Sequence, residues 1–123
     1  MAFITKIEKE LIYEIALFLL TVASISFLYM EIPLLVGFLL VSLLVGGKIW
    51  YNRNDIYYFV SGALIGPAAE IICIRFGVWS YANPTFLGIP IWLPIAWGAA
   101  TVLIMRFAVT LVKMDKDRNF FKK

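Results

Sequence analysis

The stretch Ser61–Trp97, SGALIGPAAEIICIRFGVWSYANPTFLGIPIWLPIAW, decides how this chain folds. It holds two long apolar runs joined by an aromatic connection, in which Asn83-Pro84 is a turn signal. The first run carries two glycines, a proline and one carboxylate, Glu70, and two prolines lie near the start of the second run. Apolar runs of this length are typical of membrane-spanning helices, so we expect an antiparallel helical hairpin.

The composition places the whole chain in the same class as this hairpin. Hydrophobic residues make up 63% of the 123 residues and charged residues 15%, against about 45–50% and 25% in ordinary soluble domains. The length allows a single domain, residues 1–123. We therefore expect an all-α polytopic membrane protein with four transmembrane helices. The apolar runs place these helices at about residues 11–30, 33–51, 56–78 and 89–112, before a charged tail at 113–123.

The basic residues predict the orientation in the bilayer. With four spans, both termini and the second loop share one side, which carries Lys6, Lys9, Lys48, Arg53, Lys113, Lys116, Arg118, Lys122 and Lys123. At most one basic residue, Arg75, lies near the other side. Cytoplasmic segments carry the excess of Lys and Arg, so we expect both termini in the cytoplasm of a prokaryotic cell and the protein in its cytoplasmic membrane. The same bias explains the net charge of +3 without a nucleic-acid partner.

Two compositional absences exclude several kinds of chemistry. The chain has no histidine and one cysteine, Cys73, which lies within an apolar run. A chain without histidine cannot build a Ser-His-Asp or Cys-His catalytic group, and it lacks the commonest ligand of transition metals. We therefore expect no metal and no cofactor.

Glu70 is the first candidate functional residue. Gly62 and Gly66 form a GxxxG step that lets helices approach closely, and Glu70 lies one turn further along the same face. The following apolar run is the nearest candidate partner for these glycines. Because ionisable residues within the membrane mark functional sites, we expect Glu70 to be a protonated functional acid. The alternative is a packing role, in which Glu70 pairs with Arg75 or Arg106 or bonds a Tyr or Trp.

The external connection supplies the candidate substrate-binding residues. Arg75 can anchor a polar substrate group, pair with Glu31 or extend to the interface. Trp79, Tyr81 and Trp97 cluster near the same end of the hairpin. Aromatic residues also gather at membrane interfaces whatever the function, and this alternative applies to Trp92 as well. Trp97 lies deeper than an interfacial residue requires, and we expect it to line the same cavity as Glu70.

Two further ionisable residues lie inside apolar runs. Glu14 has either an interfacial role near the start of the first helix or the role of a proton-coupling carboxylate. For Arg106 we expect a side chain that extends to cytoplasmic water or pairs with Glu14.

The central hairpin resembles a family of membrane-embedded carotenoid-biosynthesis proteins, the bisanhydrobacterioruberin hydratases, and more loosely the small lycopene cyclase subunits. The resemblance covers the hairpin alone, and the hydratases are longer. The cyclases carry paired acids where this chain has Ile91-Trp92. Related uncharacterised bacterial membrane proteins share parts of the pattern. The matching elements are Glu70, Phe76-Gly77-Val78-Trp79-Ser80-Tyr81, Gly88-Ile89-Pro90 and Pro94-Ile95-Ala96-Trp97.

The resemblance implies an isoprenoid or other lipid-like substrate, bound within the membrane near the external face. It also implies acid-catalysed hydration or cyclisation of an alkene, with Glu70 as the proton donor. Trp79, Tyr81 and Trp97 would stabilise the carbocation through their ring faces. Two alternatives stay open at this point: a small proton-coupled transporter that uses Glu14, and a non-catalytic partner in a homo- or hetero-oligomer that docks through its glycines.

Overall fold

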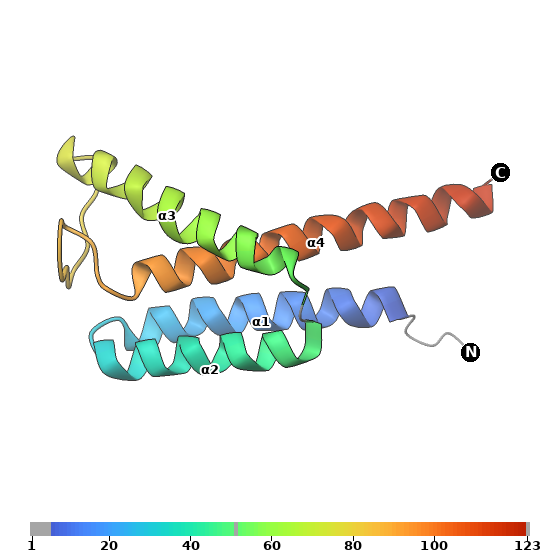
Figure 1. Cartoon of the computed structure of the whole chain (residues 1–123), viewed down its shortest axis with the longest axis horizontal. Helices are drawn as coiled ribbons and strands as arrows, with labels where there is room; N and C mark the ends of the chain where they lie inside the picture. The colour runs from blue at the N-terminus through green and yellow to red at the C-terminus, as the bar shows by residue number, and fades with distance from the viewer. Residues whose placement is uncertain (1–5, 51, 123) are drawn as a thin grey trace.

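The computed structural model describes residues 6–50 and 52–122 and is all-helical (Figure 1). The first two helices form one antiparallel hairpin and the last two form another. Both hairpin connections lie at one end of the molecule, and the start of α1 lies toward the other end, beyond which α4 extends alone. The helices are α1 (Lys6–Leu28), α2 (Ile32–Trp50), α3 (Asn54–Arg75) and α4 (Leu93–Lys122).

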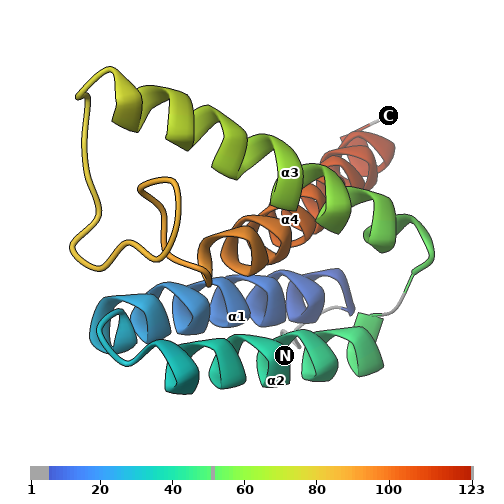
Figure 2. The same cartoon turned by 60° about the vertical axis from the view of Figure 1, so that its left-hand side comes forward.

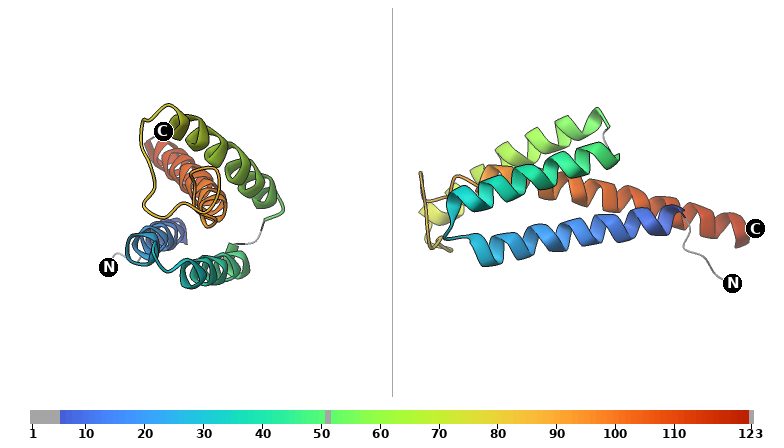
Figure 3. Two further views of the ribbon diagram at one scale, coloured as in Figure 1. Left: turned by 90° about the vertical axis from the view of Figure 1, so that its left-hand side faces the viewer. Right: turned by 90° about the horizontal axis from the view of Figure 1, so that it is seen from below.

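Helix α4 is the central element of the bundle. It packs against each of the other three helices, whereas α3 packs against α4 alone among the described helices. The end-on view in Figure 3 shows α4 between α3 and the α1–α2 pair. One consequence is that α2 and α3 border the same face of α4 without packing on each other.

The buried core is small and lies toward the end that holds the two hairpin connections. Leu35 and Leu39 of α2 pack there with Ile89, Trp92 and Leu93, all at most 4% exposed. Most other apolar side chains on the helices point outward; Leu64 and Ile65 of α3, for example, are 67% and 69% exposed. An apolar exterior of this extent is the surface that a bilayer covers.

Three helical segments are long and apolar enough to cross a membrane: α1, α3 and the part of α4 from Leu93 to Lys116. The apolar part of α2, Ile32–Lys48, is shorter. The all-α membrane-protein class is therefore supported by the structure.

The helix limits differ from the predicted ones at several ends. α1 already begins at Lys6, and α3 covers 54–75 instead of 56–78. α4 begins at Leu93 instead of residue 89, because Ile89 closes a tight turn with Phe86. α4 also continues to Lys122, through the segment predicted as a tail. The predicted end of the second helix at Tyr51 and the last tail residue, Lys123, lie outside the described residues.

Candidate functional site

Glu70 lies at the centre of a polar contact between three parts of the central hairpin. As a whole residue, Glu70 is 9% exposed. The Tyr81 hydroxyl donates a hydrogen bond to Oε1, and the Trp97 indole N–H donates one to Oε2. The structure therefore brings together three of the five predicted catalytic and substrate-binding residues, from α3, the connection and α4.

The chain leaves α3 through a well-defined helix end. Gly77 has a left-handed backbone with φ 76°, and its N–H bonds the Ile74 carbonyl at 3.0 Å. The Val78 N–H bonds the Cys73 carbonyl, also at 3.0 Å. This pair of bonds is a Schellman motif, which glycine favours because it lacks a Cβ. The motif turns the connection away from the helix axis, and Figure 2 shows the connection bridging the separated ends of α3 and α4.

A two-residue turn then folds the connection back onto α3. Phe86 and Ile89 exchange backbone hydrogen bonds of 2.8 and 3.0 Å, and Leu87 and Gly88 between them both have positive φ. Two positive φ angles define a type I′ turn. A Cβ on Gly88 would lie 2.9 Å from Ile74 Cγ2, so the turn lies directly against α3.

Glycines allow the close approach that lets Trp97 reach Glu70. A Cβ on Gly66 would lie 2.1 Å from Cδ2 of Trp97, so the indole ring rests on the bare backbone of α3. A Cβ on Gly62 would lie 2.1 Å from Thr101 Oγ1, one turn along each helix. The two predicted packing glycines, Gly62 and Gly66, thus lie at the α3–α4 contact.

Trp92 positions Tyr81 from the inside of the bundle. Its ring meets the Tyr81 ring edge-on, with centroids 6.1 Å apart, and it is only 4% exposed. Trp92 is therefore packed within the bundle instead of exposed on its surface. Its spacing with Ala96, Ala99 and Leu103 follows one helical face, a signal that indicates burial. Within residues 6–50 and 52–122, the Trp92 Nε1 atom is buried without a hydrogen-bond partner.

The phenol of Tyr81 is held in its neutral form. Burial raises the pKa of Tyr81 above its ordinary value, and the hydrogen bond to Glu70 raises this pKa further. A neutral hydroxyl can either donate or accept a hydrogen bond, whereas the Trp97 N–H can only donate. Of the two contacts to Glu70, only the one between Tyr81 and Oε1 can therefore run in either direction.

Arg75 and Trp79 stand apart from this cluster. Arg75 ends α3 with an exposed side chain and, in the described part of the chain, pairs with neither Glu70 nor Glu31. A cation in the last turn is favoured there by the helix dipole. Trp79 is 45% exposed in the connection and makes no hydrogen bond to Glu70.

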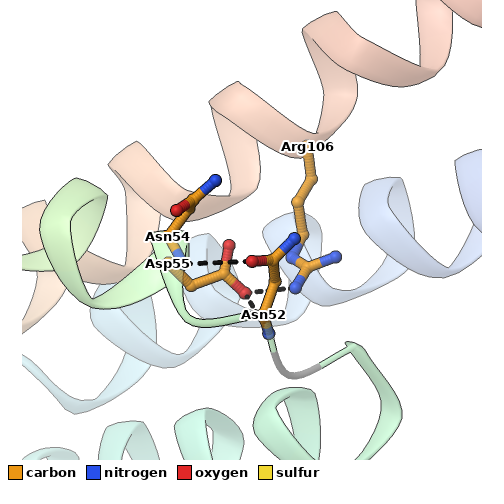
Figure 4. Close-up of polar contacts among 4 residues, drawn as sticks. All are labelled: Asn52, Asn54, Asp55 and Arg106. Carbon is orange, nitrogen blue, oxygen red and sulfur yellow. Dashed lines mark hydrogen bonds and ion pairs between the residues drawn. The ribbon is translucent and has the colours of Figure 1, made fainter.

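Arg106 forms an ion pair that differs from both roles predicted for it. Its guanidinium bonds the carboxylate of Asp55, in the first turn of α3 (Figure 4). Asp55 also accepts the Asn52 N–H at 3.2 Å, and the Asn52 side chain accepts the Asn54 N–H at 3.0 Å. Both charged side chains are 19% exposed. The pair fixes the start of α3 to α4.

Glu14 is buried instead of lying at the interface. It is 4% exposed between α1 and α4, and the Thr110 hydroxyl lies 2.9 and 3.0 Å from its two carboxyl oxygens. The same hydroxyl lies 2.9 Å from the Arg106 carbonyl. Glu14 also lines an apolar cavity of about 270 Å³ with Phe18 and Phe107.

Metal ligands do not converge in the described segments, which hold no group of three His, Cys, Asp or Glu side chains able to bind an ion. Comparison of the chain with known protein families, curated proteins and solved structures finds no match.

Proposed function

We propose that the chain crosses the cytoplasmic membrane of a prokaryotic cell four times, with both termini in the cytoplasm. What supports the fourth span is the length of α2, whose 19 residues extend about 28 Å at 1.5 Å per residue. That length is close to the hydrocarbon thickness of about 30 Å. The grouping of the hairpin connections at one end also agrees with the one-sided distribution of basic residues.

Reporter fusions test this orientation. Fusions at Asn54 and after Lys123 should report cytoplasmic positions, and fusions at Glu31 and Asn83 should report external ones. An external signal at Asn54 or Lys123 would overturn the proposed topology.

Within this topology, we propose that the protein binds an isoprenoid or other lipid-like molecule in the membrane near the external face. Its proposed chemistry is acid-catalysed alkene hydration or cyclisation. The observation that carries the proposal is the buried carboxyl of Glu70, joined to one phenol and one indole. A neutral carboxyl can protonate an alkene, and the faces of aromatic rings attract the carbocation that forms.

The proposed reaction regenerates the acid. The Glu70 Oε1 proton adds to one alkene carbon and leaves a cation on the other. In hydration, a water molecule adds to the cation and returns one proton to the carboxylate. In cyclisation, a second alkene of the same molecule attacks the cation, and a different proton passes from a carbon beside the new cation to the Glu70 carboxylate. Tyr81 keeps its hydrogen bond to Oε1 in both states, because its hydroxyl can accept from the acid and donate to the carboxylate.

Arg75 and Trp79 have a different place in this proposal. Both are exposed at the external end of α3 and in the connection, where an amphiphilic substrate would present its polar group. Arg75 can bind that group by charge, and Trp79 can pack on the chain beside it.

Glu70→Gln tests the acid, because it keeps the size and polarity of the side chain but removes the transferable proton. Membranes containing the protein are incubated with linear polyene isoprenoids, and products are identified by a mass gain of one water or by an unchanged mass with altered retention. We expect the Gln variant to fold and to lose the product. Glu31→Gln, at an exposed external position, is the matched control. Full activity of Glu70→Gln would leave Glu70 with a packing role.

The buried Glu14 favours a second candidate, a proton-coupled transporter. Glu14 lies beside an apolar cavity and contacts one hydroxyl. This arrangement can alternate between a proton and a lipophilic cation. Loss of proton-driven uptake in Glu14→Gln, with Glu70→Gln unaffected, would favour the transporter. Loss in neither variant would favour a non-catalytic partner in an oligomer.

A further inference from the structure

A second cavity, of about 230 Å³, lies in the half of the bundle opposite to Glu70. It is bounded by α2 on one side and α3 on the other, with α4 as its floor and two residues of α1 completing the wall. Because α2 and α3 do not pack on each other, this groove opens sideways between them, toward the surrounding bilayer of the proposed topology. Representative lining residues are Leu39, Leu43, Gly47, Phe59, Val60 and Val102.

The walls of this groove offer almost no polar partner. Only Thr21 and Ser42 among its uncharged lining residues carry a hydroxyl. Each hydroxyl already bonds the carbonyl four residues earlier on its own helix, at 2.9 and 3.0 Å. An occupant of the groove therefore gains mainly from burial of hydrocarbon.

One end of the groove is charged and carries an excess of positive charge. Asp55 and Arg106 line it and neutralise each other. Lys48 directly follows the lining residue Gly47, and Arg53 lies two residues before Asp55. Both cations are exposed and pair with no carboxylate in the described part of the chain. Two exposed basic residues thus lie close in sequence to lining residues at this end of the groove, and neither is balanced by a carboxylate of the described residues.

The dimensions of the groove fit the headgroup end of a lipid chain. From Arg106 to Ala99, both of which line it, α4 rises about 10 Å. One leaflet contributes about 15 Å of hydrocarbon, half of a bilayer core. The extent of the groove along α4 is therefore about two thirds of the thickness of one leaflet.

We propose that this groove binds one acyl chain of an anionic membrane phospholipid, with the lipid phosphate between Lys48 and Arg53. The proposal rests on the membrane orientation given above and is independent of any chemistry at Glu70. The bound lipid fills the space between α2 and α3 and thereby joins the two hairpins where protein contacts do not.

Native mass spectrometry of the delipidated full-length protein in a non-ionic detergent tests this assignment. The probes are phosphatidylglycerol and phosphatidylcholine with identical chains. Each basic residue near a lipid phosphate contributes roughly a fivefold gain in affinity, so we expect the anionic lipid to bind about thirtyfold more tightly. Replacing both cations, Lys48→Gln with Arg53→Gln, should abolish this preference. Equal binding of the two lipids by the unaltered protein would overturn the proposal.

Two glycines of α2 provide a matched pair that tests the groove itself. A Cβ at Gly47 or at Gly37 meets nothing within 4 Å, so a larger side chain fits at either position. Of these two glycines, Gly47 lines the groove and Gly37 does not. Gly47→Leu should reduce binding of both lipids at least tenfold, and Gly37→Leu should leave it unchanged. Equal effects of the two substitutions would refute the site. Displacement of the lipid by glycerol phosphate, which has no chain, would also refute it.

The test remains decisive if Gly47→Leu does not fold, since the double variant at Lys48 and Arg53 alters only exposed side chains. Loss of product in Glu70→Gln with unchanged lipid preference would separate the two sites. A failure of the proposed chemistry would therefore leave the lipid assignment intact.

Discussion

Replacing Gly66 with alanine should be among the most damaging single-methyl changes in this protein. The new Cβ would lie 2.1 Å from Trp97 Cδ2 and 2.6 Å from Cε3, so the rigid indole must move. Overpacking of this kind costs about 1–3 kcal/mol. The displaced indole also loses its hydrogen bond to Glu70, which costs about 0.5–1.5 kcal/mol for the neutral carboxyl proposed above. Alanine returns up to about 1 kcal/mol through its higher helix propensity. We expect a net destabilisation of about 0.5–4.5 kcal/mol.

Thermal unfolding in detergent, followed by circular dichroism, measures this effect. Gly37→Ala is the matched control, because its Cβ meets nothing within 4 Å and the change should be neutral or slightly stabilising. Leucine at Gly66 should cost still more, whereas leucine at the exposed Ile65 should be tolerated. Equal melting temperatures for Gly66→Ala and Gly37→Ala would refute the close contact between α3 and α4.

Two further predictions concern the polar contacts of the bundle. Asp55→Ala should destabilise the protein by about 1–3 kcal/mol, because it leaves the mostly buried Arg106 without this carboxylate. A double-mutant cycle that combines Asp55→Ala with Arg106→Leu should show that the two free-energy changes are coupled. Simple additivity of the two changes would contradict the ion pair. The raised pKa of Tyr81 means that its neutral form stabilises the fold fully below the ordinary tyrosine value of about 10 and that this contribution is lost as the pH rises further. In an ultraviolet titration, the absorbance change due to Tyr81 is the difference between the curves of the unaltered protein and of Tyr81→Phe, and it should appear only above pH 10. Ionisation of the Tyr81 phenol at the ordinary pKa of tyrosine would contradict the hydrogen bond.

The sequence was sufficient to predict the helical class and the central contact. Long apolar runs require helices in a bilayer, because each backbone group must find its partner within its own segment. The GxxxG spacing of Gly62 and Gly66 predicts a close partner helix, and α4, the next helix in the chain, is the nearest candidate. Glu70 follows on the same face, so a contact between Glu70 and Trp97 can be predicted from the sequence.

The positions of the charged partners could not be predicted in the same way. The connection between α3 and α4 spans residues 76–92, and a segment of that length leaves the register of the two helices undetermined. The Schellman motif at Gly77 and the type I′ turn at Gly88 fix that register. The first includes a hydrogen bond to the Ile74 carbonyl, and the second packs against the Ile74 side chain. Burial of Trp92 depends on contacts with α2, which lies distant in sequence.

Once a single contact fixes the register, the remaining pairs follow from geometry. Gly62 meets Thr101, and antiparallel α-helices rise equally per residue. Moving seven residues toward the start of α3 reaches Asp55, and moving five toward the end of α4 reaches Arg106; the long arginine side chain spans the remaining offset. Two turns in the opposite direction, Glu70 lies level with Leu93, the first residue of α4. There it accepts hydrogen bonds from Trp97, one turn further along α4, and from Tyr81 of the connection. The same antiparallel register therefore produces an ion pair at one end of the hairpin and an aromatic-bound acid at the other.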